Sequence, residues 1–224
     1  MLRISKKNCT FARFLAQNEM KQTAIIVPEG CKRVLLHACC APCSSAIVEW
    51  LLAHQITPVI YYYNPNIYPL EEYEKRKNES KRHAESLGIQ WIDDDYCHDT
   101  WRCAVKGLEN EPERGQRCVA CFLHRLTATA KKAQELGIPF FATTLASSRW
   151  KNLEQINAAG LQAAEAYGVT FWAQNWRKDG LQERRNELLK EYGFYNQKYC
   201  GCEFSMPAER RDGELHGSEQ PERR

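Results

Sequence analysis

From Lys32 onward, short apolar runs alternate with longer segments in which apolar residues recur at helical spacing. The short runs are rich in β-branched and aromatic residues, which predicts strands at 34–37, 58–63, 89–92, 139–143 and 169–172. The longer segments predict helices at 44–54, 71–87, 122–136, 152–167 and 181–192. The pattern therefore repeats a strand followed by a helix.

This alternation predicts an α/β fold, because strands joined through helices form right-handed crossovers and a mainly parallel sheet with helices on both faces. Ligands of such sheets bind beyond the carboxyl ends of the strands. A cysteine-rich turn follows Leu36 at such a strand end. We therefore expect the chemistry of the protein to lie at this turn.

The chain divides into three predicted segments. Residues 1–31 form an N-terminal extension with a predicted helix over 9–20, and 32–204 form one catalytic α/β domain. The tail, 205–224, is charged and nearly free of large apolar residues, which predicts disorder. The net charge of +3 is too small to indicate a nucleic-acid-binding protein by itself.

The interpretation of the cysteines depends on the compartment in which the protein is expected. No apolar run is long enough to span a bilayer, and the N-terminus does not resemble a signal peptide, so we expect a cytoplasmic protein. Thiols seldom form structural disulfides in a reducing cytoplasm. The eleven cysteines therefore indicate metal binding or redox chemistry.

Two cysteine groups have the spacing of metal ligands. Cys39, Cys40 and Cys43 lie in the turn between the first strand and its helix, and Cys118 and Cys121 open the helix after 115. The positive end of a helix dipole favours thiolates at both places. Four thiolates from two loops suit zinc or an iron–sulfur cluster. Successive side chains tend to diverge, which is awkward for one tetrahedral zinc ion but allows each cysteine to bind a different iron of a cluster. The plainer alternative is that Cys39 and Cys40 are small buried residues at a strand end.

The pair Cys200-Gly201-Cys202 has a different character. Two cysteines one residue apart form only a small, strained disulfide ring, and a strained disulfide is easily reduced. Gly201 supplies the backbone freedom that the turn needs. The pair is therefore either a redox-active dithiol or two inert thiols. The remaining cysteines have no recognisable spacing and are interpreted as ordinary thiols: Cys9, Cys31, Cys97 and Cys103. The segment 93–103, which carries three consecutive aspartates, is interpreted as a solvated acidic loop.

Five motifs in order resemble the QueH family of epoxyqueuosine reductases, over about 32–205 of the chain. The motifs are Leu35-Leu36-His37-Ala38-Cys39-Cys40-Ala41-Pro42-Cys43-Ser44, Tyr63-Asn64-Pro65-Asn66-Ile67 with Glu72-Tyr73-x-x-Arg76, Cys118-x-x-Cys121 with Arg125-Leu126 and Thr129-Ala130, Phe141-x-Thr143-Thr144-Leu145-x-x-Ser148, and Tyr199-Cys200-Gly201-Cys202.

The resemblance implies an enzyme that reduces epoxyqueuosine to queuosine at the wobble position of tRNA, the last step of queuosine biosynthesis. It implies a Rossmann-like fold of the adenine-nucleotide hydrolase superfamily, although the Ser-Gly-Gly-x-Asp-Ser loop of ATP-using members is missing, which argues against ATP use. Cys200 and Cys202 would be the redox-active pair, reset by an unidentified external electron donor. Cys39, Cys40, Cys118 and Cys121 would hold a [4Fe-4S] cluster, and Cys43 is the candidate to hold an additional iron beside it.

The partner implied by the resemblance is a tRNA that carries epoxyqueuosine. Side chains near the second strand could stack on its base or meet its phosphates, or else be core and solvated residues: Tyr61, Tyr62, Tyr63, Tyr68, Lys75, Arg76, Lys77, Lys81 and Arg82. Two alternatives remain open, a zinc-stabilised nucleic-acid-binding module without catalysis, and a tRNA-thiolating or disulfide-reductase enzyme.

Overall fold

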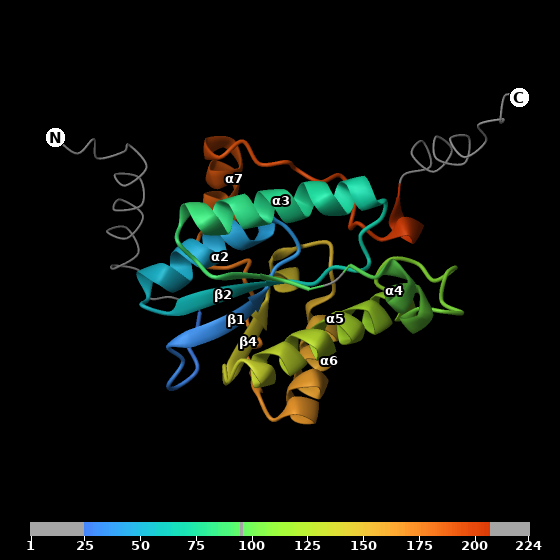
Figure 1. Ribbon diagram of the computed structural model, residues 1–224, viewed down its shortest axis with the longest axis horizontal. Coiled ribbons are helices and arrows are strands. Elements are labelled where there is room, and N and C mark those ends of the chain that lie inside the picture. Colours follow the sequence, from blue (N-terminus) through green and yellow to red (C-terminus); the bar gives the residue numbers. More distant parts are fainter. Residues whose placement is uncertain (1–24, 95, 207–224) are drawn as a thin grey trace, which may run out of the picture.

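The computed structural model describes residues 25–94 and 96–206, which form a five-stranded parallel sheet between two layers of helices (Figure 1). The strands are β1 Arg33–His37, β2 Thr57–Tyr62, β3 Trp91–Asp93, β4 Phe140–Thr143 and β5 Thr170–Phe171. The helices are α2 Ala41–Ala53, α3 Leu70–Ser86, α4 His98–Ala104, α5 Gln116–Glu135, α6 Leu153–Tyr167 and α7 Leu181–Glu191, with short 3₁₀ turns η1 Thr144–Ser147 and η2 Glu203–Ser205. The α/β prediction is confirmed.

Alternate residues of the strands face two separate cores, as the period of a β-strand requires. Leu36 and Ile60 pack with α2, α3 and α7 on one face, whereas Leu35, Val59 and Phe141 pack with α5 and α6 on the other. Figure 1 shows these two groups of helices on opposite sides of the sheet. A strand buried on both faces must be apolar throughout, which explains the short continuous runs in the sequence.

The sheet order β3-β2-β1-β4-β5 places the first strand at the centre. The chain moves outward from β1 to β2 and β3, and then returns to the other side of β1 to form β4 and β5. The order therefore reverses between β1 and β4. Sheets of this kind leave a crevice beyond the carboxyl ends of the strands at the reversal, so the turn after β1 lies where ligands are expected.

The cysteine-rich turn becomes a helix sooner than predicted. Helix α2 begins at Ala41, directly after Cys40, which has extended backbone angles (φ −175°, ψ 163°) and stands at the N-cap. Pro42 lies in the first turn, where its missing N–H has no intrahelical partner to lose. As a result Cys43 belongs to the first turn of the helix rather than to a loop.

One helix was missed from the sequence. The segment interpreted as a solvated acidic loop contains α4, whose Trp101 is completely buried, so that interpretation is wrong. Seven residues are too few to display a helical period, and the burial of Trp101 depends on contacts with distant residues. None of the described helices is long and apolar enough to cross a membrane.

The ends of the predicted domain are only partly covered. The helix predicted over 9–20 and all of the tail after Met206 lie outside the described residues. Two residues of the predicted extension, Ile25 and Cys31, are buried in the core beside α2. The boundary at 31/32 stays a prediction, but the last part of the extension packs against the domain.

His83 of α3 gives the fold a dependence on pH. Its ring is 4% exposed and packs edge-on against Tyr192 and Phe194, and its Nε2 has no partner among the described residues. Burial, together with the charge of Arg82, lowers its pKa to about 4. The neutral ring therefore contributes stability above about pH 6.5, and this contribution is lost as the pH falls toward 4.

We expect His83→Phe to reduce the pH dependence of the free energy of unfolding between pH 6.5 and 4, because phenylalanine keeps the ring contacts and does not titrate. The wild-type slope should exceed that of the variant by up to about 1.4 kcal/mol per pH unit. Urea unfolding at a series of pH values measures both slopes. Parallel curves for the two proteins would contradict the assignment.

Candidate metal and redox site

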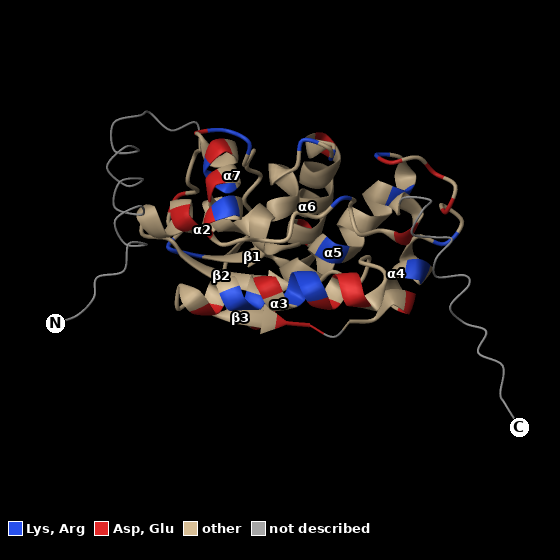
Figure 2. Cartoon of the chain, turned by 90° about the horizontal axis from the view of Figure 1, so that it is seen from above, with Lys and Arg blue, Asp and Glu red and all other residues tan. Residues whose placement is uncertain are grey.

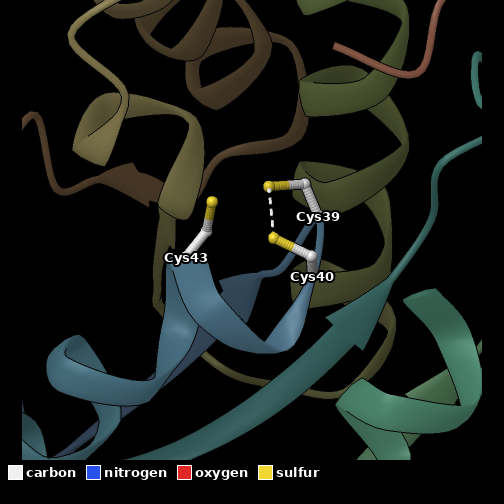
Figure 3. Close-up of side chains that lie close together, drawn as sticks. All are labelled: Cys39, Cys40 and Cys43. Carbon is white, nitrogen blue, oxygen red and sulfur yellow. Dashed lines mark hydrogen bonds between the residues drawn. The ribbon is translucent and has the colours of Figure 1, made fainter. Parts of the chain in front are cut away.

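Cys39, Cys40 and Cys43 form a compact group at the N-terminus of α2 (Figure 3). Their three Sγ atoms all lie within 4.8 Å of one another, and those of Cys39 and Cys40 are 3.8 Å apart. The expectation that the adjacent cysteines would diverge is therefore wrong. The extended backbone of Cys40 and the immediate start of the helix turn both side chains to the same side. This is the group of described residues whose spacing would suit a single metal ion.

Buried hydrogen bonds hold the turn in place from both neighbouring strands. Asn64, which follows β2, donates through Nδ2 to the Ala38 carbonyl at 2.9 Å. On the other side, Thr144 after β4 accepts a hydrogen bond from the Cys39 amide at 3.2 Å. Arg125 of α5 donates to Asn64 Oδ1 and so joins the turn to the opposite wall of the site. The ends of three adjacent strands therefore fix the cysteines.

Hydrogen bonding, charge and burial shift the pKa values of the three thiols in opposite directions. Hydrogen bonds from Cys40 and then Cys43 hold the pKa of Cys39 well below its usual range, and Lys151 and Arg125 act in the same direction. Burial raises the pKa of Cys40, and the hydrogen bond to Cys39 raises that of Cys43 to about 11. The group therefore favours one thiolate supported by two thiols, and a bound cation would favour the loss of the other protons.

A cavity of about 590 Å³ lies beside this group and gathers cysteines from three segments of the chain. Cys43 contributes from α2, Cys118 and Cys121 from the first turns of α5, and Cys200 and Cys202 from the C-terminal loop. The volume falls within the range of small-molecule pockets. The structure thus brings the three predicted cysteine groups to one place, although they are separated by up to 163 positions between Cys39 and Cys202.

The environment of Cys118 and Cys121 is more apolar than their position at the start of a helix suggested. Cys118 is half-buried and its Sγ accepts a hydrogen bond from the Arg114 amide at 3.2 Å. Cys121 packs in an apolar group with Cys202 and the buried ring of Trp101. Burial raises the pKa of all three thiols, to about 12 for Cys202. These thiols therefore lose their protons, and become ligands, only when a metal ion or another strong positive charge is close to them.

The loop of Cys200 and Cys202 is held by an arginine clamp. Arg76 is 2% exposed and donates to the carbonyls of Tyr199 and Cys200, both at 3.2 Å. Its guanidinium is bound to Glu72 at 2.7 and 2.9 Å. Because Arg76 lies in α3 and the loop lies more than 120 positions later, the clamp is a tertiary contact that orients the two thiols.

The order of the motifs is that of one protein family. The family model described as epoxyqueuosine reductase QueH matches residues 34–208. The chain belongs to the QueH family. It is 46% identical over 197 residues to the epoxyqueuosine reductase QueH of Histophilus somni, covering 88% of this chain and 81% of that protein.

Two further QueH relatives agree. The epoxyqueuosine reductase QueH of Haemophilus influenzae is 48% identical over 80% of this chain and 74% of its own length, and that of Acinetobacter baylyi is 47% identical over 80% and 83%. The family resemblance inferred from the motifs is confirmed.

Several of the side chains suggested for binding a base or phosphates are engaged in contacts within the protein. Tyr61 and Tyr62 are completely buried, and Tyr61 donates to Asp94. Arg76 is used by the clamp, and Lys77 is paired with Asp93 at 2.5 Å. Sequence analysis gave no role to Lys151, Trp150 or Gln197, which line the cavity. Gln197 donates to Cys40 Sγ at 2.9 Å, and no local pattern announces such a contact.

We expect Gly201→Ala to disturb the dithiol loop. Gly201 has φ +103°, and an added Cβ would lie 2.9 Å from Ile67 Cγ1 and 3.0 Å from Arg76 Nη1. The strain should lower the free energy of unfolding by about 1–3 kcal/mol and change the rate at which Cys200 and Cys202 are oxidised. Urea unfolding and thiol titration during exposure to oxidised glutathione measure these effects.

The matched control is Gly88→Ala, because Gly88 has φ +66° and an added Cβ would meet no atom within 4 Å. This variant should lose stability through its backbone alone and keep wild-type thiol oxidation. Equal oxidation rates in both variants would show that the clamp does not control the loop.

Proposed function

We propose that this chain reduces epoxyqueuosine in tRNA to queuosine. The observation that carries the proposal is the meeting of five cysteines from three segments around one cavity, in a member of a family whose relatives are named epoxyqueuosine reductase. Its place at the reversal of a parallel sheet is where small-molecule chemistry is expected. A tRNA substrate would place the reaction in the cytoplasm.

The reaction needs two electrons and two protons. The epoxide oxygen leaves as water, and a carbon–carbon double bond remains in the product. A dithiol supplies both electrons and both protons when it becomes a disulfide, so the Cys200 and Cys202 pair balances the reaction without a further donor in the same turnover. An external reductant must then restore the dithiol before the next turnover.

The donor set suits an iron–sulfur cluster. Cys39 and Cys40 would bind from the α2 side and Cys118 and Cys121 from α5, which together provide the four thiolates of a [4Fe-4S] cluster. Ligands on different corners of a cluster need not be as close as ligands of one ion, so the separation of the two pairs is compatible with this assignment. The cluster would supply single-electron transfer and a Lewis acid for the epoxide oxygen.

Cys43 fits the ligand of an additional iron. It belongs to the compact group with Cys39 and Cys40, and it also lines the cavity in which a substrate would lie. A cation beside Cys43 would therefore face both the cluster ligands and the substrate. Thiolates equally suit zinc, and since the adjacent cysteines do not diverge, metal analysis must decide between the two.

The residues of the chain prepare the dithiol for reaction. Arg76 and Glu72 orient the loop, and the Tyr68 amide donates to the Gly201 carbonyl at 2.8 Å. Cys200 is half-buried at the cavity, whereas Cys202 is buried against Trp101. These differences support a role for Cys200 in meeting the substrate and for Cys202 in completing the disulfide. Both are free thiols in the structure.

We expect Cys200→Ser and Cys202→Ser each to lower turnover by about a hundredfold or more while keeping the metal content of the wild type, because one thiol cannot form the disulfide. The measurement is mass analysis of nucleosides from epoxyqueuosine-containing tRNA, incubated anaerobically with reduced, iron-loaded protein. Cys97→Ser, at an exposed site, is the control. Undiminished turnover in both variants would remove the dithiol from the mechanism.

We expect Cys39→Ala and Cys118→Ala to abolish the brown colour and the bound iron and sulfide of anaerobically purified protein, because each removes one cluster ligand. Cys103→Ala should leave all three unchanged, since Cys103 is exposed and does not line the cavity. A colourless wild-type protein that holds zinc and leaves epoxyqueuosine unchanged would instead establish a zinc-stabilised binding module.

A further inference from the structure

The charged side chains around the cavity are almost all of one sign. Five basic residues line it with side chains that are exposed or half-buried, and they are Arg114, Arg149, Lys151, Arg185 and Lys198. Arg117 also lines it, but this residue is buried and donates to backbone carbonyls. Among the described residues, Glu113 is the one acidic side chain that lines the cavity. We call the five basic residues the cationic rim.

The rim differs from the mixed charged surface of α3. None of its five residues forms an ion pair with another residue in the part of the chain that the structure describes. Along α3, by contrast, acidic and basic residues are mixed, as Figure 2 shows, and Lys81 and Arg82 are near Glu85 and Glu79 at 3.9 and 3.8 Å. The positive charge of the rim is therefore available to an anionic partner.

A tryptophan stands within the rim. Trp150 is 67% exposed, whereas the other large apolar side chains with substantial exposure among the described residues are aliphatic. The Arg149 guanidinium lies 5.0 Å from the centre of its ring. Trp150 also lines the cavity, so an aromatic surface is exposed beside the cationic rim.

The loop that carries Trp150 is fixed from two sides. Arg114 donates through Nε to the Trp150 carbonyl at 2.8 Å. Arg177 donates to the carbonyls of Ser148 and Lys151 at 2.6 and 3.0 Å. Three hydrogen bonds thus hold the backbone of 148–151, so the exposed indole is presented in a defined position.

We propose that the cationic rim and Trp150 form the seat of a single-stranded RNA loop, with Trp150 stacked on a base next to the nucleotide that enters the cavity. Proteins that bind single-stranded nucleic acid combine basic grooves for the phosphates with aromatic rings for the bases, and the rim has both. A base must leave its neighbours to reach a cavity, and an aromatic ring replaces the lost stacking.

The identity of the RNA as a tRNA anticodon loop rests on the proposed function. The sequence suggested a surface near β2 and α3, where Arg76 is buried and Lys77 is paired with Asp93. The rim instead combines residues from the turn before α5, the loop after η1, α7 and the C-terminal loop. These segments meet around the cavity.

The test uses binding alone, with a fluorescein-labelled anticodon stem-loop hairpin as the probe and fluorescence anisotropy as the measurement. Trp150→Ala should weaken binding by about tenfold or more, and Trp150→Phe should weaken it less, because phenylalanine keeps part of the stacking surface. Leu161→Ala, an exposed position outside the cavity, is the matched control and should leave the affinity unchanged.

The salt dependence tests the phosphate contacts. The double variant Arg149→Gln with Lys198→Gln should lower the slope of log affinity against log salt by about 1.4, at about 0.7 for each lost contact with a single strand. The control is Lys81→Gln with Arg82→Gln on α3, which should leave the slope unchanged. Circular dichroism and urea unfolding establish that each variant is folded.

The outcomes separate this inference from the proposed reaction, because the hairpin contains no epoxyqueuosine and the assay needs no turnover. Wild-type binding that Trp150→Ala and the rim variant leave unchanged would overturn the RNA seat, even if the protein reduces epoxyqueuosine. Binding that depends on Trp150 and the rim would support the seat even if no reduction is found. Failure of the wild-type protein to bind the hairpin would overturn it as well.

Discussion

The reversal of strand order between β1 and β4 is the constraint on which the site depends. Because β1 has parallel neighbours on both sides, the turn after it is the point from which the sheet spreads in two directions. Asn64 from one neighbour and Thr144 from the other can therefore both reach this turn. The N-terminus of α2, which carries the positive end of the helix dipole, then lies at Cys39 and Cys43, where it favours their thiolate forms.

Arginine serves the site in two physically different ways. Arg76 and Arg125 are buried, and each binds carbonyl or amide oxygens that belong to segments carrying or contacting the cysteines. A planar guanidinium with several donors suits this task, because one side chain can connect separate pieces of backbone. The arginines of the rim, represented by Arg149, keep their charge at the surface and form no ion pair with the described part of the chain, which suits the binding of a polyanion.

Several features of the site could be read from the residues before the fold was known. The three cysteine groups and the order of the motifs were sufficient to indicate the family and to expect one shared site, and the structure brings all three groups to one region. Two predictions about surroundings were wrong. Cys39 and Cys40 converge, and the segment around Trp101 is a helix. Each depends on contacts with residues far along the chain.

The sequence by itself determined the repeated strand and helix pattern, the parallel sheet and the grouping of the cysteines, because strand periods, helix periods and cysteine spacing are local properties. Tertiary structure alone decided that Gln197 meets Cys40, that Arg76 holds the Cys200 loop and that Trp150 stands exposed among the basic residues of the rim. The physical reason is that burial, ion pairing and hydrogen bonding are set by neighbours in space, and those neighbours come from segments that the sequence places far apart.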